Sequence, residues 1–234
     1  SAIALGNPVS LPAELINQIL EAYGVPTLAI RLAKTAQEAV QLAEQVGFPV
    51  ALKVASSTIA HKSDIGGVLL NLPDAEAVAQ GFEVILQNVR QAHPMAEVQG
   101  VYVQRMIPPG QEVIVGATQD EQFGALVMFG SGGVEVEALQ DVGFALAPIS
   151  DYEIEHLLQT TWAGRKLNGY RNLPPADRPA VIDVLRRIAQ LAADFPQIEE
   201  IEINPLRVLE TGKGAAALDV RARVRIPSSP TASR

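Results

Sequence analysis

Residues 49–72, PVALKVASSTIAHKSDIGGVLLNL, place a polar loop between two apolar segments. The flanking segments, Pro49–Val54 and Val68–Leu72, have the length and the apolar, β-branched character of buried strands. The loop between them carries hydroxyl groups and His61, and it ends in a pair of glycines. Backbone N–H groups of glycines can cradle oxyanions, so this composition favours an anion-binding loop over a plain connector.

Lys53 lies inside the first apolar segment. A strand lysine often extends its ammonium group to solvent from an edge strand. Alternatively, it acts as a point charge directed into a cleft at a phosphate. The sequence leaves both interpretations open.

On both sides of this stretch, helix patterns alternate with strand patterns. Thr35 and Glu38 have capping-box spacing, and Asp74 is a typical N-cap before a run of apolar residues with helical period. Ser10 predicts the N-cap of a helix over residues 10–23. Further strands are expected at 26–31, 98–104, 112–117, 125–129, 142–147, 200–209 and 215–220, further helices at 150–158 and 181–195, and a loop at 163–179.

Pro108-Pro109-Gly110 predicts a hinge, because two prolines cannot extend a sheet ladder. We therefore expect two α+β subdomains, approximately 25–106 and 107–226, with the helix 10–23 packed beside the second. A ligand cleft between the subdomains is the natural place for function. Residues 227–234, rich in Ser and Pro, are expected to form a disordered tail.

Composition excludes several classes of protein. The chain has 234 residues, 48% of them hydrophobic, and a formal net charge of −8, which argues against nucleic acid as the main partner. The absence of cysteine excludes disulfides, Cys-ligated zinc and a thiol nucleophile. No uncharged stretch is long enough to span a bilayer, and no secretory signal pattern is present, so we expect a cytoplasmic protein without a membrane partner.

A second polar pattern lies near the C-terminal end, in Glu200-Ile-Glu-Ile-Asn-Pro205. Glu202 and Asn204 share one face of a strand because side chains alternate with period two. Asp219, on the expected neighbouring strand, can complete a set of oxygen ligands suited to Mg²⁺. The alternative is a buried Glu–Asn pair satisfied by the backbone.

The common phosphate-binding fingerprints are absent from the sequence, including the Gly-x-x-x-x-Gly-Lys-Ser/Thr loop. A less specific pattern is an apolar run from Phe123 that ends in Gly130-Ser-Gly-Gly133. It reads either as a buried strand followed by a glycine turn or as a place where the backbone approaches a ligand.

Together these segments resemble the ATP-grasp domain of the NDP-forming (ADP-forming) acyl-CoA synthetases, which are related to the β subunit of succinyl-CoA synthetase. The resemblance covers about Leu11 to Val224. Its most specific stretches are Gly47–Lys53, His61–Val68, Glu112–Gly116 and Ile203–Pro205. The resemblance implies the ATP-grasp fold, an α+β fold whose two subdomains hold the nucleotide cleft between them.

The resemblance also implies roles for individual residues. Lys53 would contact the phosphates of ATP or ADP, and the loop glycines would close over them. Asn204 and Asp219 match the magnesium ligands, Glu202 matches an acid that steadies a visiting phosphohistidine, and His61 matches a histidine that relays the phosphoryl group. The expected nucleotide contacts are Lys53, Gly66, Gly67, Val68, Gln104, Arg105, Met106 and Glu112, with 103–106 forming the hinge that receives adenine.

The implied reaction is acyl-CoA + phosphate + ADP = acid + CoA + ATP, through a phosphohistidine. No CoA-binding domain and no first phosphohistidine can be located in this sequence. We therefore expect a CoA-binding α subunit or fused domain as partner, and a hetero-oligomer in the full enzyme. The alternative is a catalytically idle regulatory ATP-grasp domain of a protein lysine acetyltransferase. Because such a domain is expected to lose the relay histidine, His61 favours the enzyme.

Overall fold

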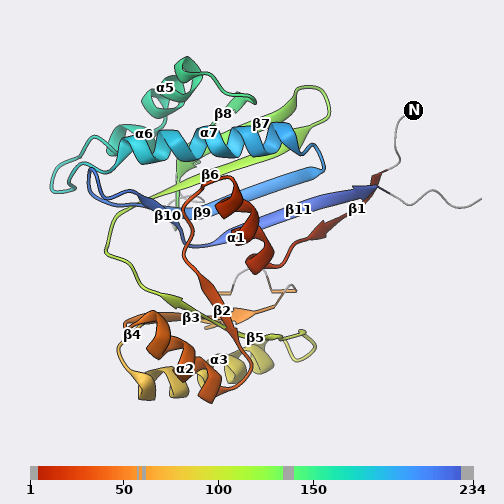
Figure 1. The fold of residues 1–234 in the computed structure, drawn as a ribbon, viewed down its shortest axis with the longest axis vertical. Helices are drawn as coiled ribbons and strands as arrows, with labels where there is room; N and C mark the ends of the chain where they lie inside the picture. The colour runs from red at the N-terminus through yellow and green to blue at the C-terminus, as the bar shows by residue number, and fades with distance from the viewer. Residues whose placement is uncertain (1–4, 57, 60–61, 134–139, 228–234) are drawn as a thin grey trace, which may run out of the picture. The chain divides into compact units, whose positions relative to one another are not determined.

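The computed structural model describes residues 5–56, 58–59, 62–133 and 140–227. The chain divides into two compact units (Figure 1). Unit 2 is Leu28–Pro108, and unit 1 combines Ser1–Thr27 with Pro109–Arg234. Unit 2 is thus inserted into the sequence of unit 1. Each unit has its own sheet and its own hydrophobic core.

Unit 2 contains a four-stranded antiparallel sheet of order β2-β5-β3-β4. Its strands are β2 (Ile30–Ala33), β3 (Val50–Ala55), β4 (Val68–Leu72) and β5 (Gly100–Arg105), and its helices are α2 (Ala36–Val46) and α3 (Ala75–Ala92). Both helices pack on one face of the sheet (Figure 1), where Leu52, Val54, Phe82, Ile85 and Val103 form the centre of the core.

The N-caps predicted at Thr35 and Asp74 are confirmed, but the capping box of Thr35 and Glu38 is incomplete. The hydroxyl of Thr35 accepts a hydrogen bond from the Glu38 amide at 3.1 Å, and α2 ends at Gly47 with φ +85°. The Glu38 carboxylate accepts from the amide of Lys34 rather than from that of Thr35. The carboxylate of Asp74 accepts from the Ala77 amide at 2.9 Å and begins α3.

Unit 1 contains a seven-stranded antiparallel sheet of order β1-β11-β9-β6-β7-β8, with β10 paired to β9. The strands are β1 (Leu5–Ser10), β6 (Gln111–Asp120), β7 (Gly124–Ser131), β8 (Val142–Leu146), β9 (Ile198–Val208), β10 (Ala215–Ala217) and β11 (Val220–Pro227). The helices are α1 (Ala13–Ala22), α5 (Asp151–Thr160), α6 (Trp162–Lys166) and α7 (Arg178–Asp194).

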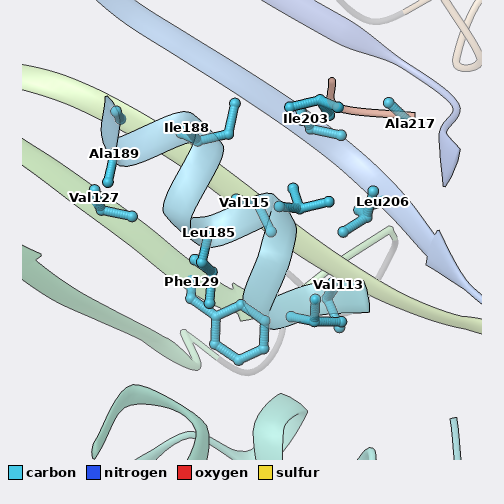
Figure 2. Close-up of a cluster of buried hydrophobic side chains, with 14 of the residues drawn as sticks. Val113, Val115, Val127, Phe129, Leu185, Ile188, Ala189, Ile203, Leu206 and Ala217 are labelled. Carbon is cyan, nitrogen blue, oxygen red and sulfur yellow. The ribbon is translucent and has the colours of Figure 1, made fainter. Parts of the chain in front are cut away.

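Helix α7 supplies the main hydrophobic contacts of this sheet. Figure 2 shows Leu185, Ile188 and Ala189 of α7 in one buried cluster with Val113 and Val115 of β6 and Val127 and Phe129 of β7. Each fully buried side chain of this size stabilises the fold by roughly 1.5–3 kcal/mol. Side chains alternate along a strand, so the residues between the buried residues of β9 point to the opposite face of the sheet. That face is polar along β9.

The N-terminal prediction was wrong in its boundaries. Ser10 is the last residue of β1, which pairs with β11, and the helix expected over 10–23 runs from Ala13 to Ala22 after Pro12. Of the expected strand 26–31, only residues 30 and 31 lie in a strand, which is β2 and continues to Ala33. Thr27 forms an isolated parallel bridge with Ala217. Pairing with a distant strand, which no local pattern reports, decides both cases.

Two C-terminal predictions also need correction. The expected loop 163–179 contains α6, which Thr161 caps by accepting a hydrogen bond from the Gly164 amide at 3.2 Å. The expected strand 215–220 is two strands, β10 and β11, so Asp219 lies in the bend between them. Pro227 ends β11, and the rest of the expected tail, 228–234, lies outside the described residues.

Asp177 fastens the start of α7 to the turn that follows β9. Its side chain is largely buried, and its two oxygens accept hydrogen bonds from the amides of Ala180 at 3.2 Å and Gly214 at 2.7 Å. Its own amide donates to the Leu209 carbonyl at 2.8 Å. One buried carboxylate therefore serves as a helix cap and as a link between segments far apart in sequence.

We expect Asp177→Ala to lower the free energy of unfolding by about 2 kcal/mol, because the cap and a buried amide both lose their acceptor. The matched control is Asp74→Ala, which removes an exposed cap alone and should cost about 1 kcal/mol. Urea unfolding followed by circular dichroism measures both. Equal losses in the two variants would contradict the linking role of Asp177.

Candidate functional site

The polar face of unit 1 brings three of the expected site residues together. Glu202 and Asn204 lie on β9, on the face opposite the buried Ile201 and Ile203. The amide of Asn204 donates to the backbone carbonyl of Asp219 at 3.0 Å. The bend between β10 and β11 therefore places Asp219 beside Asn204. The sequence predicted that Asp219 would lie near Asn204, but on a neighbouring strand and not in a bend.

The side chain of Asn204 is held in one orientation. Its Oδ1 accepts a hydrogen bond from the amide of Gly133 at 2.9 Å, and its side chain is hydrogen-bonded to Glu202. An amide oxygen has two lone pairs, so one remains for a cation. The hydrogen bond between Gly133 and Asn204 joins the glycine turn after β7 to β9. The glycine pattern 130–133 and the polar pattern 200–205 of the sequence therefore lie next to each other.

Glu202 occupies a costly position for a negative charge. Burial is the main cause that raises its pKa, and the nearby carboxylates of Glu200 and Asp219 raise it further. The hydrogen bond with Asn204 and the charge of Arg221 act in the opposite direction, but the pKa stays above its usual value. A cation bound next to Glu202 would favour its ionised form.

The donor set fits magnesium. Within the ranges that the structure describes, no group of three or more His, Cys, Asp or Glu residues could hold a metal ion. Asn204 and Asp219 instead offer one amide and one carboxylate oxygen donor. Mg²⁺ is commonly held by one or two protein ligands and completed by substrate phosphates and water, so this sparse set suits it.

Glu112 adjoins the same glycine turn from β6. Its Oε1 pairs with Nη2 of Arg207 at 2.5 Å, and its backbone carbonyl accepts from the Gly132 amide at 3.2 Å. Its Oε2 lies 2.3 Å from the point where a Cβ on Gly133 would stand, and Gly133 has φ +63°. A side chain at position 133 would displace the Glu112 carboxylate and would have a strained backbone conformation, so glycine is favoured there. Glu112 and Asn204 therefore contact the same glycine turn. Arg207 could not be identified from the sequence, because its place opposite Glu112 depends on the register of β6 and β9.

The glycine turn is also supported from its other side by Asp141, a second residue that the sequence did not reveal. Asp141 accepts hydrogen bonds from the Ser131 hydroxyl at 2.8 Å and from the amides of Trp162 at 2.7 Å and Ala163 at 2.8 Å. Burial alone would raise the pKa of Asp141, but these hydrogen bonds lower it. The carboxylate therefore stays ionised and anchors the turn.

In unit 2, Lys53 lies on β3, between β4 and β5. It is directly opposite Tyr102 on β5 and Val68 on β4, and it is half-buried. The interpretation of Lys53 as an edge-strand lysine is therefore wrong. Lys53 shares the sheet face that points away from α2 and α3 with Gln104, whose neighbour across the strands is Ala51.

The loop before β4 forms a hydrogen-bonded turn, and the expected contacts of Gly66 and Gly67 with phosphate stay a prediction. The amide of Gly66 donates to the Ser63 carbonyl at 3.1 Å, and the amide of Gly67 donates to the Lys62 carbonyl at 2.8 Å. The Gly67 carbonyl accepts from the Val54 amide at 2.8 Å. In this arrangement both glycine amides build the turn itself. His61 lies outside the described residues.

The expected adenine hinge, 103–106, covers the last three residues of β5 and Met106. Gln104 is buried, and its side-chain amide donates to the Leu28 carbonyl at 3.4 Å. Arg105 is exposed, and the amide of Met106 donates to the Pro49 carbonyl at 3.0 Å. The backbone is therefore fixed here by two neighbouring segments of the same unit.

Comparison with known proteins connects these residues to a family. A family model described as an ATP-grasp domain matches residues 6–224. The β subunit of an ADP-forming acetate–CoA ligase from Pyrococcus furiosus is 42% identical over 87% of this chain and 87% of its own length. The solved structure of the dinucleotide-forming acetyl-coenzyme A synthetase 1 from Ca. Korarchaeum cryptofilum is 39% identical, with a TM-score of 0.87 over 92% of this chain and 93% of that one.

Other relatives are longer. An ADP-forming acetate–CoA ligase from Archaeoglobus fulgidus is 44% identical over 83% of this chain, but the match spans only 28% of that protein. Across the described residues, none of the helices has the length and apolar character needed to cross a membrane. The fold, the matched range and the β-subunit relative agree. The chain belongs to the ATP-grasp family and, within it, to the β-subunit-like domains of the ADP-forming acetyl-CoA synthetases.

Proposed function

We propose that this chain is the nucleotide-binding and phosphoryl-transfer part of an ADP-forming acyl-CoA synthetase, with acetyl-CoA as the favoured substrate. The reaction is acyl-CoA + phosphate + ADP = acid + CoA + ATP, through a phosphohistidine. The observation that carries the proposal is the cluster of Glu202, Asn204 and Asp219 joined to the Gly133 turn. A related structure contains coenzyme A and Mg-AMPPCP, with a phosphohistidine segment pointing towards its nucleotide site.

The chain's own residues have separate tasks in this proposal. Lys53 places a positive charge at the phosphates, and Glu112 accepts hydrogen bonds from the nucleotide. Asn204 and Asp219 hold Mg²⁺, which when bound neutralises phosphate charge in the transition state. Glu202 accepts a hydrogen bond from the imidazole N–H of the visiting phosphohistidine and keeps its phosphorylated nitrogen pointed at the nucleotide.

His61 is proposed as the relay that takes the phosphoryl group from the partner's histidine and passes it to ADP. Neutral imidazole suits this step, because its unperturbed pKa of about 6.5 leaves a nucleophilic nitrogen at neutral pH. The P–N bond to the partner histidine breaks as the P–N bond to His61 forms. That second bond then breaks as the terminal oxygen of ADP attacks phosphorus.

The remaining chemistry is assigned to a partner that binds CoA and carries the first phosphohistidine. Such a partner is either a separate α subunit or a domain of the same polypeptide. The β-subunit relative supports the first arrangement, and the longer Archaeoglobus relative supports the second. The full enzyme is therefore proposed to join the two parts, as a hetero-oligomer or as a fused chain.

We expect the chain to bind Mg²⁺-ADP and the variant Asn204→Ala/Asp219→Ala to lose the gain in affinity that Mg²⁺ provides, because its protein ligands are gone. Titration calorimetry with Mg²⁺ and with EDTA measures this gain. Asp151→Ala, on the exposed start of α5, is the control and should bind like wild type. Nucleotide binding by wild type that does not respond to Mg²⁺ would contradict the proposed metal site.

We expect His61→Asn to leave the dissociation constant of Mg²⁺-ADP nearly unchanged and to slow phosphoryl transfer from the phosphorylated partner by about a hundredfold or more, because asparagine cannot carry phosphate. Rapid-quench measurement of phosphohistidine decay gives the rate. Transfer at the wild-type rate in this variant would mean that the partner's histidine delivers phosphate to ADP directly.

A further inference from the structure

Arg207 forms an ion pair within the candidate site that the proposed mechanism does not use. It lies on β9 directly opposite Glu112 on β6, and its Nη2 is 2.5 Å from Glu112 Oε1. The Arg207 side chain is 19% exposed and that of Glu112 is 33% exposed. A pair this sheltered is screened less by solvent and salt than a surface pair, so it can fix the carboxylate in place.

The position of the carboxylate matters to the neighbouring turn. The ion pair uses Oε1, and Oε2 lies against Gly133. The Gly132 amide donates to the Glu112 carbonyl, and the Gly133 amide donates to Asn204 Oδ1. A short series of contacts therefore leads from the Arg207 guanidinium, through Glu112 and the glycine turn, to the amide oxygen that is proposed to hold magnesium.

Arg207 is not placed for stability alone. Its Nε is buried and has no hydrogen-bond acceptor among the described residues. An unpaired buried donor lowers stability, so a contribution to stability does not by itself account for an arginine at this position. The planar guanidinium holds a carboxylate in a fixed direction, which the flexible ammonium of lysine does less well.

We propose that Arg207 is a positioning residue of the nucleotide site. It holds the Glu112 carboxylate and, through the Gly132–Gly133 turn, sets the orientation of Asn204 Oδ1. This inference rests on the proposed function, which assigns Glu112 and Asn204 to the Mg²⁺-nucleotide site. Arg207 itself does not contact the nucleotide or Mg²⁺ in this proposal. It affects the affinity for Mg²⁺-ADP by holding Glu112 and Asn204 in position.

A double-mutant cycle on Arg207 and Glu112 tests the inference, with Mg²⁺-ADP as the probe and calorimetry as the measurement. We expect Arg207→Met to weaken binding about tenfold, and Glu112→Gln to weaken it at least as much. The double variant should bind no more weakly than Glu112→Gln alone, because Arg207 acts through Glu112. Arg207→Lys should fall between wild type and Arg207→Met.

Arg223→Met is the matched control. Arg223 pairs with Glu200 across β11 and β9, and both side chains are about half exposed. This variant removes an arginine–glutamate pair from the same sheet and should keep wild-type affinity. Methionine fills much of the volume of arginine and Glu112 can be hydrated, so Arg207→Met is expected to fold. Thermal unfolding checks this, and Arg207→Lys carries the test if Arg207→Met does not fold.

Wild-type affinity in Arg207→Met, or in Arg207→Lys if Arg207→Met does not fold, overturns the inference and leaves the proposed function intact. Additive losses in the double variant also overturn it, because Arg207 would then act independently of Glu112. A wild-type chain that binds no Mg²⁺-ADP contradicts the proposed function itself, and the inference falls with it.

Discussion

The hydrogen bond from the Gly133 amide to Asn204 Oδ1 is the contact on which the candidate site depends. It requires a turn after β7 that passes close to β6, where a side chain on Gly132 would collide with the backbone of Val113. It also requires β9 to lie next to β6, so that Asn204 comes within reach of the turn. The hydrogen bond therefore depends both on the strand order of unit 1 and on the glycines of the turn.

The hydrophobic core makes such a polar face possible. Strands β6, β7 and β9 are anchored on one side by buried residues that pack on α7, so their other side can carry charges without loss of the fold. The raised pKa of Glu202 shows that this face holds a carboxylate where burial disfavours its charge. Sites of this kind are typical of function, because stability alone would not select them.

Features set by neighbours in sequence could be predicted, and features set by strand pairing could not. The caps at Thr35 and Asp74 involve atoms a few residues apart, and both form. Strand β1 exists only through pairing with β11, and the Glu112–Arg207 pair exists only through the register of β6 and β9. The sequence likewise could not show that the loop glycines donate their amides within their own turn.

The central claim, that this chain moves a phosphoryl group between nucleotide and a partner's histidine, has one direct test. The chain is incubated with Mg²⁺-[γ-³²P]ATP and the cognate CoA-binding part, and acid-labile, base-stable label on that part is measured. The account predicts rapid labelling that needs both this chain and Mg²⁺. A folded chain that binds Mg²⁺-ATP but leaves the partner unlabelled would contradict it.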